Sequence, residues 1–297
     1  MTPALTPRGL TVTLRPVSLN SQAEAFFTAS GVRLRRRGSR PGAFNWLMLP
    51  GGPGIGSESL FGLADALDVP GTCWMVDLPG DGSNVSPPGA PQNPYDVWPR
   101  VLIEAAQALP NCVYLGHSTG GMYLLSVPEL ESLLVGMVLV STAPDASWRA
   151  PFFEMTQRHP LPEVDAATRR YETERTDERL RDIAVASAEW NFTPESVAAG
   201  RELLRRMPYN RAAVDWSDRN FDETYVHTWW PRSLPTLIIS GAEDRIVQQT
   251  PWSQPAFQGP HILHQRVEGA AHFPWMERPD AVASAMRALV ARMTPRP

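Results

Sequence analysis

The sequence contains little cysteine, no large excess of charge and no long apolar run. Cys73 and Cys112 are the two cysteines among 297 residues, too few for a disulfide framework and suited to a reducing cytoplasm. The 27 basic and 31 acidic residues give a formal net charge of -4, which gives no reason to expect nucleic acid or an anionic membrane as a partner. The longest apolar stretch, residues 133–140, is far below the ~20 residues that cross a bilayer.

The sequence also lacks the marks of secretion and of metal binding. Residues 1–16 carry prolines and polar side chains but no apolar signal-peptide segment, so we expect a cytoplasmic protein. No spacing of cysteine and histidine resembles a metal site, and no internal repeat is present. What the chain does have is a hydrophobic fraction of 43%, which is enough for a substantial buried core.

Strand-like and helix-like segments alternate over most of the chain. The strand-like runs are residues 45–49, 72–76, 112–115, 135–140, 236–240 and 265–267. Helical patterns lie at 97–109 and 279–293, and a hairpin of two strands is expected over 25–37. The alternation predicts an α/β fold with a mostly parallel, doubly wound sheet.

One segment interrupts this alternation. Between residues 145 and 232 the strand-like runs disappear, and helical patterns such as 165–188 and 194–207 take their place. We therefore predict a helical cap at 145–232, inserted into a core formed by residues 1–144 and 233–297.

The segment Gly116-His117-Ser118-Thr119-Gly120 lies between a strand-like run and a helical pattern. A Gly-x-Ser-x-Gly at such a junction is typical of a nucleophile elbow, in which a tight turn lifts the serine above the edge of the sheet. Glycines two residues on either side keep side chains out of the crowded turn. Ser118 is therefore the candidate nucleophile, whereas an ordinary turn serine is the alternative.

With this elbow, the chain resembles the α/β-hydrolase fold superfamily. Within it, the sequence is similar to capped members of the proline iminopeptidase-like and esterase type, which carry a His-Gly-Gly-Pro-Gly loop. Pro50-Gly51-Gly52-Pro53-Gly54 matches all of that loop but its first residue. The histidine usually braces the loop in these proteins, and its replacement by Pro50 leaves the backbone N–H donors in place.

The resemblance implies a catalytic triad in the chain order serine, acid, histidine. It places the acid at Asp244, after the strand at 236–240, and the histidine at His272 in the run Gly269-Ala270-Ala271-His272. His272 would take the proton of Ser118, and Asp244 would fix the imidazole and stabilise its cation. Asp145 is the alternative acid, because some members of the fold place it one strand earlier.

Two further pairs of residues complete the predicted site. The oxyanion hole would use the backbone N–H groups of Thr119 and Gly52. Glu189 and Trp190 are candidate substrate-binding residues, because iminopeptidases hold the free amine of the substrate with cap glutamates. Surface charge for Glu189 and packing for Trp190 are the alternatives.

We interpret the chain as a serine hydrolase that cleaves an ester, thioester or amide of a small apolar acyl group. The reaction would pass through an acyl-enzyme and would need neither cofactor nor metal. We expect a small-molecule substrate, no nucleic acid or membrane partner, and a monomer or homodimer. The alternatives are a proline iminopeptidase-like aminopeptidase, or a cofactor-free lyase, oxygenase or non-catalytic ligand receptor on the same fold.

Overall fold

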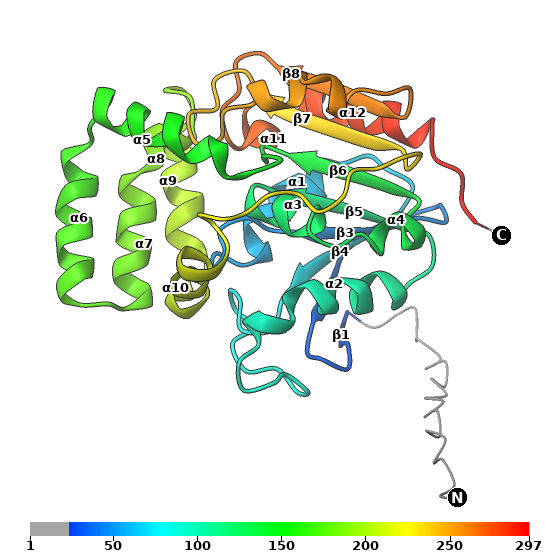
Figure 1. Cartoon of the computed structure of the whole chain (residues 1–297), viewed down its shortest axis with the longest axis horizontal. Helices are drawn as coiled ribbons and strands as arrows, with labels where there is room; N and C mark the ends of the chain where they lie inside the picture. The colour runs from blue at the N-terminus through cyan, green and yellow to red at the C-terminus, as the bar shows by residue number, and fades with distance from the viewer. Residues whose placement is uncertain (1–23, 297) are drawn as a thin grey trace, which may run out of the picture.

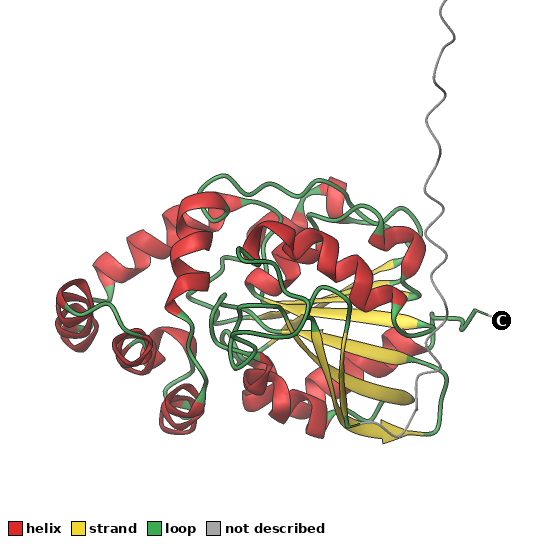
Figure 2. Ribbon diagram, turned by 90° about the horizontal axis from the view of Figure 1, so that it is seen from below, coloured by secondary structure: helices red, strands yellow, loops and turns green. Residues whose placement is uncertain are grey.

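A sheet of eight strands forms the centre of the computed structural model, which describes residues 24–296 (Figures 1 and 2). The strand order is β1-β2-β4-β3-β5-β6-β7-β8. The strands are β1 (Ala25–Phe27), β2 (Arg33–Arg40), β3 (Asn45–Leu49), β4 (Gly71–Asp77), β5 (Cys112–His117), β6 (Gly136–Val140), β7 (Thr236–Gly241) and β8 (Ile262–Val267). All pairs from β4 to β8 are parallel, whereas β1 pairs with β2, and β2 with β4, in antiparallel fashion.

Helices cover both faces of this sheet, as the predicted doubly wound fold requires (Figure 2). They are α1 (Phe61–Ala66), α2 (Trp98–Gln107), α3 (Thr119–Leu124), α4 (Leu130–Leu133), α11 (Pro274–Glu277) and α12 (Pro279–Val290). Successive side chains of β3 enter opposite layers, Trp46 and Met48 on the α12 side and Leu47 and Leu49 on the α2 side. Central strands buried on both faces explain the continuous apolar runs in the sequence.

The order of the strands keeps the two cysteines apart. Cys73 lies on β4 and Cys112 on β5, and β3 lies between these strands. Both thiols are free and buried. Within residues 24–296, no helix is long and apolar enough to cross a membrane.

Six helices follow one another between β6 and β7 and gather at one end of the sheet (Figure 1). They are α5 (Arg149–Arg158), α6 (Pro162–Thr173), α7 (Asp177–Ala186), α8 (Ala188–Asn191), α9 (Val197–Arg206) and α10 (Arg211–Asn220). The expected helical stretch 165–188 is interrupted, because α6 ends at Thr173 and the Thr176 side chain caps α7 by accepting the Arg179 N–H at 3.2 Å. The domain boundaries at 144 and 232 stay a prediction.

Candidate active site

Ser118 occupies the sharp turn between β5 and α3. Its backbone has φ 51° and ψ -125°, a strained conformation for a residue with a side chain. A Cβ on Gly116 would lie 2.6 Å from the Cα of Gly121, and one on Gly120 would collide with the carbonyl oxygen of Pro50. Close packing therefore requires the two glycines that flank this partly exposed serine.

His272 and Asp244 form a hydrogen-bonded pair at the edge of the sheet where Ser118 also lies. Nδ1 of His272 lies 3.1 and 3.0 Å from the two carboxylate oxygens of Asp244. Oδ1 of Asp244 also accepts the N–H groups of Ile246 at 2.9 Å and Val247 at 3.0 Å. Because Asp244 follows β7 and His272 follows β8, parallel strands bring both to the carboxyl edge where Ser118 follows β5.

The glycine-rich loop after β3 lies against the elbow. The hydroxyl of Thr119 donates to the carbonyl oxygen of Gly52 at 2.9 Å, so the two residues predicted for the oxyanion hole are in contact. Farther along, the N–H of Gly54 donates to Oδ1 of Asp81 at 2.7 Å. Burial raises the pKa of Asp81 to about 7, although the N–H groups of Gly54 and Gly82 lower it.

This arrangement agrees with the sequence match to a known family. Residues 46–285 match the model of the Alpha/beta hydrolase family. The chain belongs to the alpha/beta hydrolase family. The match confirms both the predicted resemblance and the predicted fold class.

Curated relatives of this alpha/beta hydrolase carry esterase names. A pimeloyl-(acyl-carrier protein) methyl ester esterase of Xanthomonas oryzae pv. oryzae is 26% identical over 238 residues, covering 73% of this chain and 83% of the relative. The protein of the same name from Xylella fastidiosa strain M23 is 22% identical over 239 residues, covering 75% and 86%. The family and these relatives support the prediction of an ester-hydrolysing enzyme.

Solved structures share the fold of this alpha/beta hydrolase. A proline iminopeptidase-related protein from Thermus thermophilus aligns with a TM-score of 0.68 at 19% identity, covering 91% of this chain and 98% of that one. An esterase from Rhodococcus sp. ECU1013 aligns with a TM-score of 0.63 at 18% identity, covering 92% and 99%. At these identities the likeness concerns the fold alone.

The alternative acid, Asp145, has a different partner. Its side chain accepts the N–H of Ser147 at 2.9 Å and caps the short 3₁₀ helix Ala146–Trp148. Asp244, not Asp145, is hydrogen-bonded to His272. The structure therefore favours Asp244 over Asp145 as the acid of the site.

His117, next in the chain to Ser118, packs against His272. The two rings lie 4.8 Å apart, and Nε2 of His117 contacts the carbonyl oxygen of His272 at 3.0 Å. Burial, and secondly the neighbouring His272, lower the pKa of His117 well below its usual range, so the ring is neutral. Since a carbonyl only accepts, Nε2 of His117 carries the proton and donates it. This contact joins the end of β5 to the loop that carries His272.

Glu189 and Trp190 have partners of their own. The Glu189 side chain is 50% exposed and pairs with Arg201 at 3.0 Å. Trp190 is buried, and its indole N–H donates to the carbonyl oxygen of His159 at 2.9 Å. These contacts favour the surface and packing alternatives, so the predicted role of the two residues in substrate binding gains no support.

Glu277 and Asn210 are two polar residues near the site that the sequence analysis did not single out. The carboxylate of Glu277 accepts the N–H of Ala271 at 2.5 Å and the N–H of Thr193 at 2.7 Å. The backbone N–H of Asn210 donates to the carbonyl oxygen of Gly54 at 2.8 Å. No local motif marks either residue, because Thr193 and Gly54 come from distant parts of the chain, although Ala271 lies 6 positions from Glu277.

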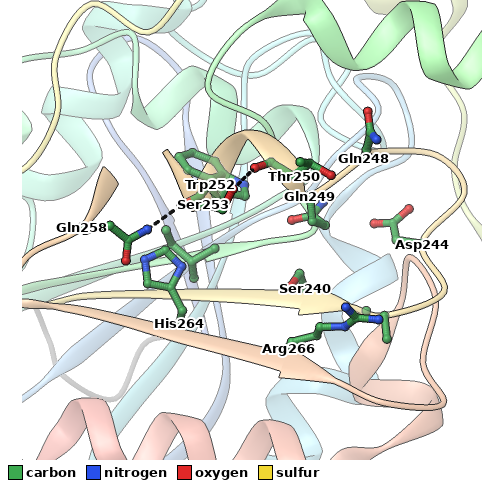
Figure 3. Close-up of a pocket in the computed structure, with 13 residues that line it drawn as sticks. Ser240, Asp244, Gln248, Gln249, Thr250, Trp252, Ser253, Gln258, His264 and Arg266 are labelled. Carbon is green, nitrogen blue, oxygen red and sulfur yellow. Dashed lines mark hydrogen bonds between the residues drawn. The ribbon is translucent and has the colours of Figure 1, made fainter. Parts of the chain in front are cut away.

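A polar cavity of about 570 Å³ lies beside β7 and β8, next to the loop that carries Asp244 (Figure 3). Ser240, His264, Arg266 and Gln258 line it together with Asp244. Neither Ser118 nor His272 is among its lining residues, so it is separate from the elbow. Within residues 24–296, no group of three or more histidine, cysteine, aspartate or glutamate side chains could hold a metal ion.

Proposed function

We propose that this alpha/beta hydrolase is a carboxylic ester hydrolase with Ser118 as nucleophile, His272 as general base and Asp244 as its acid partner. The observation that carries the proposal is the hydrogen bond between Nδ1 of His272 and Asp244. An ionised carboxylate only accepts, so Nδ1 is the protonated nitrogen. Nε2 then keeps the lone pair that can take a proton from a serine hydroxyl.

The reaction would proceed in two halves. Oγ of Ser118 attacks the carbonyl carbon of the ester while its proton passes to Nε2 of His272. The tetrahedral intermediate breaks the bond to the alkoxy group, which leaves as the alcohol with the proton from His272. A water molecule, deprotonated by His272, then attacks the acyl-enzyme, and the carboxylic acid leaves as Ser118 recovers its proton.

The oxyanion of both tetrahedral intermediates needs donors that are already in position. We assign this task to the backbone N–H groups of Gly52 and Thr119. Each such donor typically contributes about 3–4 kcal/mol to the stabilisation of the transition state.

An ester is the proposed substrate, because the curated relatives are named methyl ester esterases. The small apolar acyl group expected from the sequence is kept as part of the proposal. We also propose that residues 145–232 form a cap on a core of 1–144 and 233–297, and that the protein acts in the cytoplasm on a small molecule. The aminopeptidase alternative requires carboxylates that hold a substrate ammonium group. Glu189, the carboxylate predicted for that role, pairs instead with Arg201.

Two measurements test the proposal. A fluorophosphonate probe should label the wild-type protein at Ser118, and p-nitrophenyl esters of graded chain length should give a higher kcat/KM than prolyl or alanyl arylamides. A preference for prolyl arylamide would replace the esterase with the aminopeptidase. Absence of both labelling and hydrolysis would instead favour a ligand receptor or a lyase on this fold.

A further inference from the structure

The loop from Pro50 to Gly54 needs a brace, because glycines make it flexible and it lacks the histidine of similar proteins. Gly52 and Gly54 have φ values of 112° and 91°, which side-chain-bearing residues rarely adopt. A backbone with this freedom does not hold an N–H group in one place unless contacts from outside the loop fix it. The hydrogen bonds to this loop therefore show what holds it in this chain.

Three such bonds hold the loop. Asp81 accepts the N–H of Gly54 at 2.7 Å, and Asn210 donates to the carbonyl oxygen of the same residue at 2.8 Å. The third is the bond from the Thr119 hydroxyl to the carbonyl oxygen of Gly52 at 2.9 Å. Of the three, only the Thr119 bond ends on the residue whose N–H is assigned to the oxyanion hole.

The position of Thr119 suits it to this task. It is the first residue of α3 and is buried, and its backbone N–H is the second proposed oxyanion donor. Its β-branched side chain has little rotational freedom in a helix. The hydroxyl thus ties the Gly52 residue to the same rigid helix end that carries the other donor.

We propose that the side chain of Thr119 is a positioning residue, which holds Gly52 so that the two backbone N–H donors meet the same oxyanion. In this chain the hydroxyl serves in place of the loop histidine that Pro50 replaces. The inference rests on the proposed function, because it concerns the oxyanion hole of that reaction. It adds a role for the Thr119 side chain to the role of its backbone.

Two substitutions isolate the hydroxyl. Thr119→Val keeps the branched shape and removes the hydrogen bond, whereas Thr119→Ser keeps the hydroxyl and removes the methyl group. With p-nitrophenyl butyrate, we expect Thr119→Val to lower kcat about 10- to 100-fold with KM within about twofold, since loss of an entire donor costs about 10²–10³ in kcat. Thr119→Ser should stay within about threefold of wild type.

A transition-state analogue supplies a readout that a packing defect would not move. A trifluoromethyl ketone forms a tetrahedral oxyanion with an active-site serine, so Thr119→Val should weaken its inhibition by about the same factor as kcat/KM. Inhibition by the product butyrate should change by less than about twofold. If Thr119→Val does not fold, Thr119→Ala takes its place in the comparison with Thr119→Ser.

The outcomes separate this inference from the proposed function. Wild-type kcat in a folded Thr119→Val protein would overturn the brace, and so would equal losses in the valine and serine variants. A wild-type protein that neither hydrolyses esters nor reacts with fluorophosphonate overturns the proposed function itself. Both the inference and the proposed function are supported if wild type hydrolyses esters, Thr119→Val has a lowered kcat and Thr119→Ser has a kcat close to that of wild type.

Discussion

Glu277 accepts a hydrogen bond from the N–H of Ala271, the residue immediately before His272. Its second oxygen accepts the N–H of Thr193, in the segment between α8 and α9. The N–H of His272 itself donates to the carbonyl oxygen of Asn191 at 3.1 Å. The proposed base is therefore held in place from the helical segment as well as from the sheet.

Replacing Glu277 with glutamine should destabilise the protein. The side-chain amide keeps the size of the carboxyl group but retains one accepting oxygen, so one buried N–H loses its partner at a cost of about 1–3 kcal/mol. Urea unfolding measures the change in free energy. Glu268→Gln is the control, because its side chain is 79% exposed and its pairing with Arg266 contributes little. Equal stability of the Glu277→Gln variant and wild type would contradict the role of Glu277.

Substitution of Ser118 by alanine should abolish ester hydrolysis while the fold stays intact. Loss of the nucleophile lowers kcat by several orders of magnitude in enzymes of this type. Steady-state assays with p-nitrophenyl esters and labelling with fluorophosphonate both report the loss, and circular dichroism checks the fold. Wild-type turnover in Ser118→Ala would rule out the serine mechanism.

Asp244→Asn should lower kcat by about 10⁴ with little change in KM, because the amide favours the wrong tautomer of His272. Asp145→Asn is the matched control. Asparagine also caps helices well, so this variant should keep both wild-type activity and wild-type stability. If Asp145→Asn were inactive and Asp244→Asn active, the acid of the site would be Asp145, which follows β6, and not Asp244, which follows β7.

The buried carboxyl group of Asp81 should make stability depend on pH. Burial raises its pKa from 3.8 to about 7, so between about pH 4 and pH 7 the folded protein keeps a proton that the unfolded chain releases. The contribution of Asp81 to the free energy of unfolding therefore falls as the pH rises through this window. The neighbouring carboxylates Asp77 and Glu58 contribute to the raised pKa, although both of them pair with Arg35.

Asp81→Asn removes this contribution and can still accept hydrogen bonds from the loop. The unfolding free energy of the variant minus that of wild type should therefore rise by about 4 kcal/mol between pH 4 and pH 8. Urea unfolding at several pH values measures the difference. If the unfolding free energies of the two proteins changed with pH in the same way, the pKa of Asp81 would be the same in the folded and unfolded states, which would contradict the prediction.

Glu189→Gln should leave kcat/KM for esters and for prolyl arylamides within about twofold of wild type. The side chain is half exposed and pairs with Arg201, and such surface pairs contribute about 0–1 kcal/mol. Assays of both substrate classes on one preparation test this. A loss of prolyl arylamide cleavage without a loss of ester cleavage would show that Glu189 binds the substrate's amine.

The sequence singled out the candidate residues that local pattern, chain order and resemblance to a family can mark. Ser118 is marked by its flanking glycines, whereas Asp244 and His272 followed from the resemblance to the α/β-hydrolase fold. The choice between Asp244 and Asp145 needed the structure, because both follow strands whose carboxyl ends lie at one edge of the sheet. Only the hydrogen bond to His272 distinguishes them.

The supporting polar contacts could not be predicted in this way. Glu277 and Thr193 are 84 positions apart, and Gly54 and Asp81 are 27 apart, so no local spacing links the partners. The pairing of Glu189 could not be predicted either, for a related reason. The direction of a glutamate on a short helix depends on packing against its neighbours, here α9 with Arg201.

Three hydrogen bonds of backbone groups between β6 and β7 matter for protein engineering. They are made by Asn191, Thr193 and Asn210. These residues lie on the segment between β6 and β7, yet they bind the histidine loop, Glu277 and the glycine-rich loop. A chimera that received this segment from another hydrolase would change the support of the His272 loop and of the glycine-rich loop. Grafting a new specificity onto this scaffold therefore requires that the donor segment reproduce these three contacts.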